Sequence, residues 1–145
     1  MAETATTAAH SPAAASLPSL RYLGSIHEGI PCQNLDAMVK FYIDVLGLKL
    51  LPRPNLPGPG AWLGDEDNTV QFHLILSNKD YIPGPDAKMS PTGRHTAWMV
   101  RSLDDFRARM EKLGVPYHTL KGVIASDQLF VVDPEGYTWE FQEPK

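Results

Sequence analysis

The chain has 145 residues and a formal charge of −4, and 43% of its residues are apolar. That length is enough for one domain with its own core, and the composition is typical of a folded globular protein. The acidic balance and the absence of any run of Lys or Arg argue against binding to nucleic acid or to an anionic membrane. No apolar stretch approaches the roughly 20 residues of a membrane-spanning helix.

The first 20 residues differ from the rest, because Ala, Ser, Thr and Pro dominate them and neither Lys nor Arg occurs. This composition predicts a disordered leader at residues 1–20, before a single domain at residues 21–145. A plastid transit peptide is the alternative, whereas a secretory signal would need a basic start. The single cysteine, Cys32, excludes an internal disulfide and suits a cytoplasmic location.

The first predicted element is a strand at residues 24–32, in which alternation puts Cys32 opposite His27 and makes it a buried hydrophobe. Asn34 is a good N-cap for the helix that follows, and Gly47 is the expected stop. Short strands are predicted at residues 49–51, 60–63 and 69–76, with a loop rich in Pro and Gly at residues 52–60.

After a linker at residues 79–93, the same order of elements returns. A strand at residues 94–100 precedes a helix that Ser102 caps, and strands follow near residues 117–121, 128–133 and 137–142. Each half therefore reads strand-helix-strand-strand-strand, over residues 21–79 and 93–145. Two such halves predict an α+β fold with a helix packed on one face of each sheet.

The repeat also aligns four potential metal ligands. His95 follows His27 by 68 residues and Glu140 follows His73 by 67, and each early histidine stands eight residues before a Leu-Asp pair. Imidazole and carboxylate are the ligand types of transition-metal sites. In the ligand strands the bulkiest apolar residues lie on the face opposite the candidate ligand. If those faces pack on the helices, all four ligands should point into a common concave surface.

Other polar residues are weaker candidates. His10 lies in the predicted leader, and His118 fits a surface or cavity-wall position better than a ligand position. Gln71 shares the face of His73, but amides seldom bind these metals. Glu28 falls on the face opposite His27, where a structural or exposed charge is the simplest interpretation.

With these residues placed, the chain resembles the vicinal oxygen chelate superfamily, which includes glyoxalase I, bleomycin-resistance proteins and extradiol dioxygenases. The resemblance covers residues 22–143 and rests on four segments, at residues 26–31 (IHEGIP), 34–48, 94–97 (RHTA) and 133–140 (DPEGYTWE). It implies paired βαβββ modules that curl into a half-open mixed β-barrel around a metal site, with the helices outside.

The resemblance implies one divalent metal ion, either Ni, Zn, Co, Mn or Fe(II), bound by His27, His73, His95 and Glu140. Glu140 and His73 are then the candidate catalytic acids and bases. A homodimer is a possible partner arrangement, and the metal site either lies within one chain or is shared across that dimer. Glyoxalase I has a glutamate where this chain has His73, which is one departure from the family pattern.

Three function classes follow from the resemblance. In the first, which we favour, a lyase, isomerase or epimerase acts on a small oxygenated substrate, and the metal chelates and stabilises an enediolate. In the alternative, His27, His95 and Glu140 form the 2-His-1-carboxylate set of an Fe(II)-dependent extradiol-type dioxygenase. The third class is a non-catalytic small-molecule (antibiotic) binding protein, which an intact ligand set argues against. Residues 52–60 and 80–92 are candidate lids over the substrate.

Overall fold

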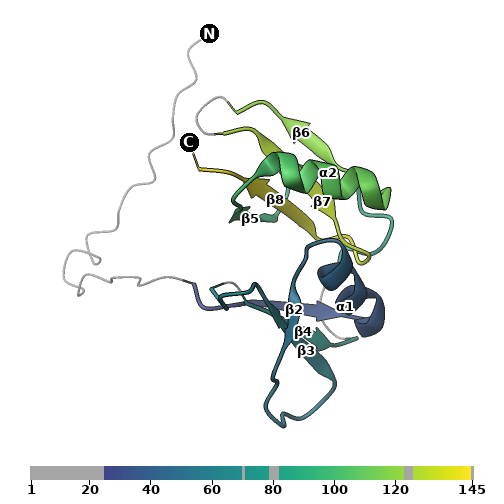
Figure 1. Cartoon of the computed structure of the whole chain (residues 1–145). Helices are drawn as coiled ribbons and strands as arrows, with labels where there is room; N and C mark the ends of the chain where they lie inside the picture. The colour runs from purple at the N-terminus through teal and green to yellow at the C-terminus, as the bar shows by residue number, and fades with distance from the viewer. Residues whose placement is uncertain (1–24, 70, 79–81, 123–125, 145) are drawn as a thin grey trace, which may run out of the picture.

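The computed structural model describes residues 25–144 except residues 70, 79–81 and 123–125. It confirms an α+β fold of two βαβββ modules (Figure 1). The first module contains β1 (Glu28–Cys32), α1 (Leu35–Asp44), β2 (Lys49–Leu51), β3 (Gly60–Gly64) and β4 (Gln71–Leu76). The second contains β5 (His95–Met99), α2 (Leu103–Leu113), β6 (His118–Leu120), β7 (Gln128–Val132) and β8 (Thr138–Gln142). The leader predicted at residues 1–20 lies outside the described residues.

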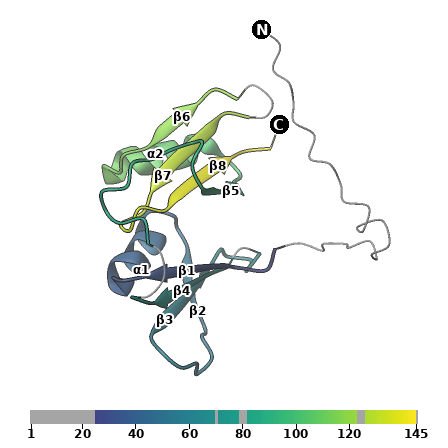
Figure 2. The same ribbon diagram turned by 180° about the vertical axis from the view of Figure 1, so that it is seen from behind.

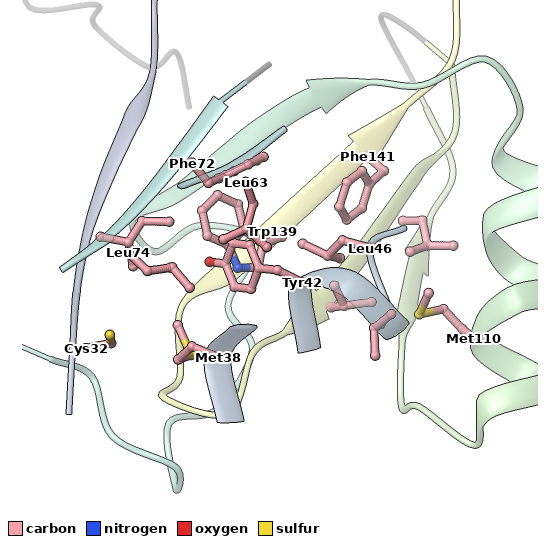
Figure 3. Packing of buried hydrophobic residues seen from close by; sticks show 14 of the residues in the cluster. Cys32, Met38, Tyr42, Leu46, Leu63, Phe72, Leu74, Met110, Trp139 and Phe141 are labelled. Atoms are coloured by element: carbon pink, nitrogen blue, oxygen red, sulfur yellow. The ribbon is translucent and has the colours of Figure 1, made fainter. Parts of the chain in front are cut away.

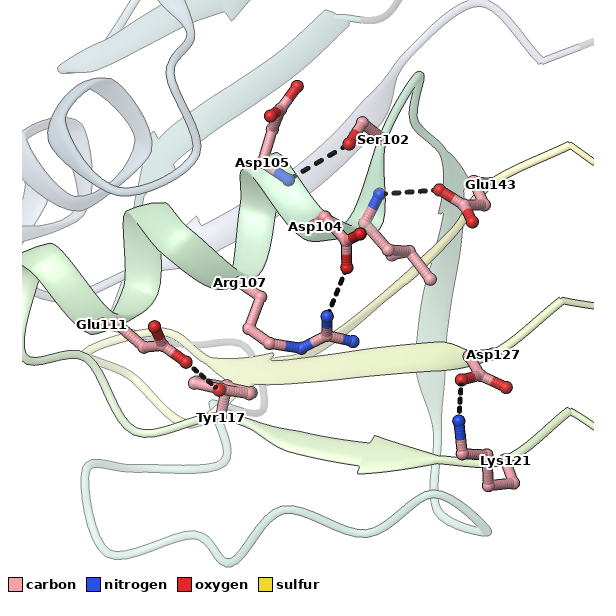
Figure 4. Close-up of polar contacts among 10 residues, drawn as sticks. Ser102, Asp104, Asp105, Arg107, Glu111, Tyr117, Lys121, Asp127 and Glu143 are labelled. Atoms are coloured by element: carbon pink, nitrogen blue, oxygen red, sulfur yellow. Dashed lines mark hydrogen bonds and ion pairs between the residues drawn. The ribbon is translucent and has the colours of Figure 1, made fainter.

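The helix caps are those that the sequence predicts. The Asn34 side chain accepts a hydrogen bond from the Ala37 amide at 3.1 Å, and Ser102 accepts one from the Asp105 amide at the same distance (Figure 4). These caps satisfy amides that a helix start leaves without partners. Helix α2 ends at Gly114 with φ of +66°, a left-handed conformation that glycine adopts at little cost. Neither helix is long and apolar enough to cross a membrane, and no other described helix exists that could.

Each module forms its own four-stranded mixed sheet, and no barrel closes among the described strands. The strand order is β1-β4-β3-β2 in the first sheet and β5-β8-β7-β6 in the second, so the two sheets have the same topology. In each, the first strand pairs in parallel with the last, and the remaining pairs are antiparallel. Figures 1 and 2 show one sheet above the other, with α1 near their junction.

One hydrophobic core is shared by the two modules (Figure 3). Phe72 of the first sheet lies 5.4 Å from Trp139 of the second, measured between ring centroids, and Tyr42 of α1 lies 5.8 Å from the same Trp139. Both sheets therefore turn their apolar faces toward one core. Because side chains alternate along a strand, the opposite face of each sheet points away from that core.

A buried carboxylate joins the modules inside this core. Asp133, which follows β7 and is only 4% exposed, accepts hydrogen bonds from the Tyr42 hydroxyl and the Trp139 indole, both at 3.1 Å. It also accepts bonds from the amides of Glu135 and Tyr137, both at 3.0 Å. Burial raises the pKa of Asp133 above its ordinary value, and the four hydrogen bonds counter part of that rise.

The second module also holds both ends of α1. The Glu135 carboxylate accepts hydrogen bonds from the Gln33 amide at 2.8 Å and the Asn34 amide at 2.6 Å, next to the helix start. At the other end, Arg109 of α2 donates to the carbonyl oxygens of Val45 at 2.8 Å and Asp44 at 2.7 Å. A negative charge thus faces the positive end of the helix dipole and a positive charge faces its negative end.

The Asp133 contacts predict a large loss of stability on substitution. Asp133→Ala leaves the Tyr42 hydroxyl and the Trp139 indole without an acceptor in the core, so we expect the free energy of unfolding to fall by about 3 kcal/mol or more. Denaturant titration followed by circular dichroism measures the change. Asp104→Ala, whose side chain is 89% exposed, is the control. A loss below about 1 kcal/mol for Asp133→Ala would contradict the importance of this network.

Candidate metal centre

The four predicted ligands form two pairs, one on each sheet. His27 directly precedes β1 and His73 lies in β4, while His95 begins β5 and Glu140 lies in β8. His95 and Glu140 lie on adjacent parallel strands, and His27 directly precedes the strand that pairs in parallel with that of His73. In each sheet the predicted ligands lie on the face that points away from the shared core. Phe72 of β4 and Trp139 of β8 lie on the other face of their sheets, which is buried in that core.

The His95–Glu140 pair is in direct contact. The Nε2 atom of His95 lies 2.8 Å from the Oε2 atom of Glu140, whose residue is only 3% exposed. The other carboxylate oxygen of Glu140 accepts short hydrogen bonds from the side-chain amides of Gln128 and Gln142. The carboxylate is therefore held on one side by two neutral donors and faces the imidazole with its free oxygen.

A backbone carbonyl sets the orientation of His95. The Nδ1 atom of its ring lies 2.8 Å from the Gly93 oxygen, an acceptor, so Nδ1 carries the donated proton. The Nε2 atom then faces the Glu140 oxygen either as a second N–H donor or with its lone pair. At 2.8 Å this contact has the length of a hydrogen bond, with a proton between the two atoms. A carbonyl-oriented imidazole is also the usual arrangement of a metal-binding histidine.

The His27–His73 pair is held by ring stacking. The two imidazole centroids lie 4.1 Å apart with an interplanar angle of 16°, and the indole of Trp62 stacks on the other side of His73 at 4.1 Å and 6°. Partial burial, and then the neighbouring His27, lower the pKa of His73. The lowered pKa favours the neutral imidazole, which is the form that binds a metal.

A single chain does not bring the two pairs together. Across the described residues, no group of three or more His, Cys, Asp or Glu side chains lies close enough to hold a metal ion. The sheets share one core and their ligand faces point away from it, so the described part of one chain does not gather the four side chains at one point. The assignment of the four residues as ligands remains a prediction, and their chemistry fits a divalent transition metal.

The weaker candidates fall at the expected places. His118 is exposed on β6, and the buried Phe130 stands in register between it and Glu140. Glu28 lies on the opposite face from His27, where its carboxylate is 3.5 Å from the Thr96 hydroxyl. Cys32 is fully buried, and burial is the main reason that its pKa rises to about 11, so the thiol is unreactive.

A cavity of about 370 Å³ lies beside His95, between β1, the start of β5 and residues 83–94. Part of its wall comes from the segment predicted as a lid, including Lys88 and Ser90, and Arg94 adds a second cationic side chain. Its volume is that of a small-molecule site. Residues 79–81 of the linker lie outside the described residues, and the closure of either predicted lid remains a prediction.

Sequence reasoning missed the residues that orient the ligands. Four residues contact a predicted ligand: Trp62, Gly93, Gln128 and Gln142. The alternation of side chains along a strand was the one signal that the sequence offered for those that lie on strands. Alternation puts Trp62 on one face of β3, but the register that places it beside His73 depends on the pairing of β3 with β4.

A family comparison agrees with this arrangement. The model of the Glyoxalase/Bleomycin resistance protein/Dioxygenase superfamily matches residues 24–141. The chain belongs to this superfamily. A relative in this superfamily, Glyoxylase I 4 of Arabidopsis thaliana, is 28% identical over 118 residues, which cover 79% of this chain and 67% of that protein.

Solved structures share the superfamily fold. TnmS3, an antibiotic binding protein from Streptomyces sp. CB03234, has a TM-score of 0.71 at 18% identity, covering 88% of this chain and 100% of TnmS3. Lactoylglutathione lyase from Agrobacterium tumefaciens has a TM-score of 0.63 at 22% identity, covering 84% and 94% of the two chains. At these identities the likeness shows the fold alone. Superfamily members generally use a divalent metal, bind small molecules and often form dimers.

Proposed function

We propose that this chain is a divalent-metal-dependent enzyme of the glyoxalase type, with lyase, isomerase or epimerase activity on a small oxygenated substrate. The observation that carries the proposal is the contact between His95 and Glu140. It pairs an imidazole that a backbone carbonyl orients with a buried carboxylate. In the repeat, these two residues match His27 and His73. Imidazole and carboxylate are ligand types of the divalent metals that superfamily members generally use.

In this proposal His27, His73, His95 and Glu140 hold the metal, which is Ni, Zn, Co, Mn or Fe(II). When bound, such an ion acts as a Lewis acid on two neighbouring oxygens of the substrate. A cytoplasmic location, consistent with the single reduced cysteine, belongs to the same proposal.

The side chains of this chain would supply the proton transfer. Glu140 is the candidate base, because Gln128 and Gln142 donate to Oε1 only and Oε2 faces the His95 imidazole. It would take a proton from a substrate carbon beside an oxygen and return one to the neighbouring carbon, which isomerises the substrate without net change in atoms. His73, kept neutral by its lowered pKa, can serve as a second base or acid.

We further propose that two copies of the chain complete the site, each supplying one pair of ligands to a shared metal. The outward direction of the two ligand faces supports this arrangement, since the described part of one chain does not bring three or more of these ligand types together. Apolar side chains on the same faces also favour it, because Ile75 is 51% exposed and Met99 is 65% exposed. A symmetric dimer of this kind contains two equivalent sites.

Substitution of Glu140 tests the proposed chemistry. Glu140→Gln keeps the shape of the side chain but removes its charge and its ability to accept a proton, so we expect turnover to fall by about 10² to 10⁴. Elemental analysis for bound metal and a thermal melt accompany the assay. Turnover within a few-fold of the unsubstituted protein, with metal still bound, would show that Glu140 has a structural role only.

His73 separates the favoured activity from the dioxygenase alternative. If His73 is a full ligand, His73→Ala should lower metal occupancy and turnover together. An Fe(II) site of His27, His95 and Glu140 should instead keep its iron without His73. Metal content is measured alongside oxygen uptake with a catechol. Iron retained in the variant, together with oxygen uptake by the unsubstituted protein, would favour the dioxygenase.

Mixing two inactive variants tests the shared site. A dimer of one His73→Ala chain and one Glu140→Gln chain contains one intact site, because both substitutions fall in the other. Random reassociation should therefore restore about a quarter of the activity per chain. Each variant reassociated with itself is the control. A monomer in sedimentation, or no recovery of activity from a verified mixed dimer, would place the site within one chain.

A further inference from the structure

Another cavity, of about 250 Å³, lies where the two modules meet, and none of the predicted metal ligands lines it. Phe72 of β4 contributes to it from the first module, and Trp98 of β5 and Phe141 of β8 contribute from the second. Because side chains alternate along a strand, these three lie on the faces of the sheets opposite the predicted ligands. The cavity is therefore on the core side of both sheets, away from the proposed metal centre.

Aromatic rings line this cavity. The rings of Phe72 and Trp98 meet across the two modules, with centroids 5.2 Å apart and an interplanar angle of 64°. Phe106 of α2 stacks on Phe141, with centroids 4.5 Å apart and an interplanar angle of 30°. Phe72 and Phe141 belong to the shared core, which fixes their positions (Figure 3). The faces of aromatic rings carry negative partial charge, so walls of this kind attract cations.

The charged residues of the lining are both acidic. Asp65 and Glu66 lie in the turn between β3 and β4, and no Lys, Arg or His is among the described residues that line the cavity. The Thr69 hydroxyl donates to the Asp65 carboxylate. Lys49 donates to the backbone oxygen of Glu66 at 2.8 Å, but the Glu66 carboxylate has no hydrogen bond or ion pair in the described part of the chain. An acidic rim beside aromatic walls favours a cation over an anion.

We propose that this cavity binds a small aromatic amine in its ammonium form, at a site separate from the metal centre. The aromatic ring of the ligand lies against Phe72, Trp98 and Phe106, and its ammonium group lies at the rim formed by Asp65 and Glu66. A cavity of about 250 Å³ is smaller than most drug-sized sites, which limits the ligand to one ring with a short chain. Because the walls come from both modules, the bound amine also stabilises their packing.

Four probes separate the ring from the charge. Phenylpropylammonium has both, phenylpropanol keeps the ring alone, propylammonium keeps the charge alone, and phenylpropanoate carries the opposite charge. Binding at low salt is followed by NMR of the indole N–H signals, assigned with Trp98→Phe and Trp62→Phe. The Trp98 N–H has no hydrogen-bond partner among the described residues, so no protein acceptor masks its response to a ligand. Trp62 stacks on His73, on the other face of the first sheet, and serves as the internal control.

We expect phenylpropylammonium to shift the Trp98 signal with a Kd on the order of 1 mM, as for other ligands of this size, and to leave the Trp62 signal unchanged. The other three probes should bind more weakly, and phenylpropanoate most weakly. Glu66→Gln should raise the Kd by about two- to fivefold, since exposed ion pairs are weak. Asp67→Asn is the matched control, because it removes the same charge from the same turn outside the cavity lining, and it should leave the Kd nearly unchanged.

Several outcomes would overturn the proposal. A shift of the Trp62 signal with none at Trp98 would place the amine on the face of the predicted metal ligands. Equal affinity for phenylpropylammonium and phenylpropanol, or equal effects of Glu66→Gln and Asp67→Asn, would show that the acidic rim does not recognise the ligand. Propylammonium binding as tightly as phenylpropylammonium would exclude a role for the aromatic walls. No shift of Trp98 at up to about 10 mM amine would show that the cavity does not bind it.

Discussion

The buried carboxylate of Asp133 is the contact on which the arrangement of the two modules depends. A carboxylate in an apolar core is costly unless donors surround it, and Asp133 has four. One of these donors, the Tyr42 hydroxyl, comes from the first module, whereas the Trp139 indole comes from the second. The correct packing of one module on the other therefore gives the buried Tyr42 hydroxyl its acceptor, and a shifted packing would leave that hydroxyl without a partner.

This packing decides where the candidate site can form. With Asp133, Tyr42 and Trp139 in one core, the apolar faces of both sheets are used within the chain. The faces that carry the histidines and Glu140 are left on the outside, each with half of a ligand set. The same contact that stabilises the chain thus separates the ligands, which explains why a second copy enters the proposal for the metal site.

Much of this could be predicted from local sequence, and the remainder depends on long-range contacts. Asn34 and Ser102 predict the helix starts because capping is a local hydrogen bond. The pairing of His95 with Glu140 also follows from the repeat, since equivalent strands occupy equivalent places in equivalent sheets. The direction in which each sheet turns its apolar face does not follow, because Phe72 and Trp139 would be buried equally well under separate helices. The stack on His73 was not predictable either, since one residue of strand slippage would turn Trp62 to the opposite face.

The other module holds both ends of α1 through Glu135 and Arg109, and among the described residues no residue of the first module does the same for α2. The repeat aligns Glu135 with Asn68 and Arg109 with the aromatic pair at residues 41–42, none of which can play the same charged roles. Helix α2 instead receives Glu143 of its own module at the Leu103 amide. The two halves share a fold but not these contacts, so they are not interchangeable. A protein assembled from two first modules would lack the acid and the base that hold the ends of α1.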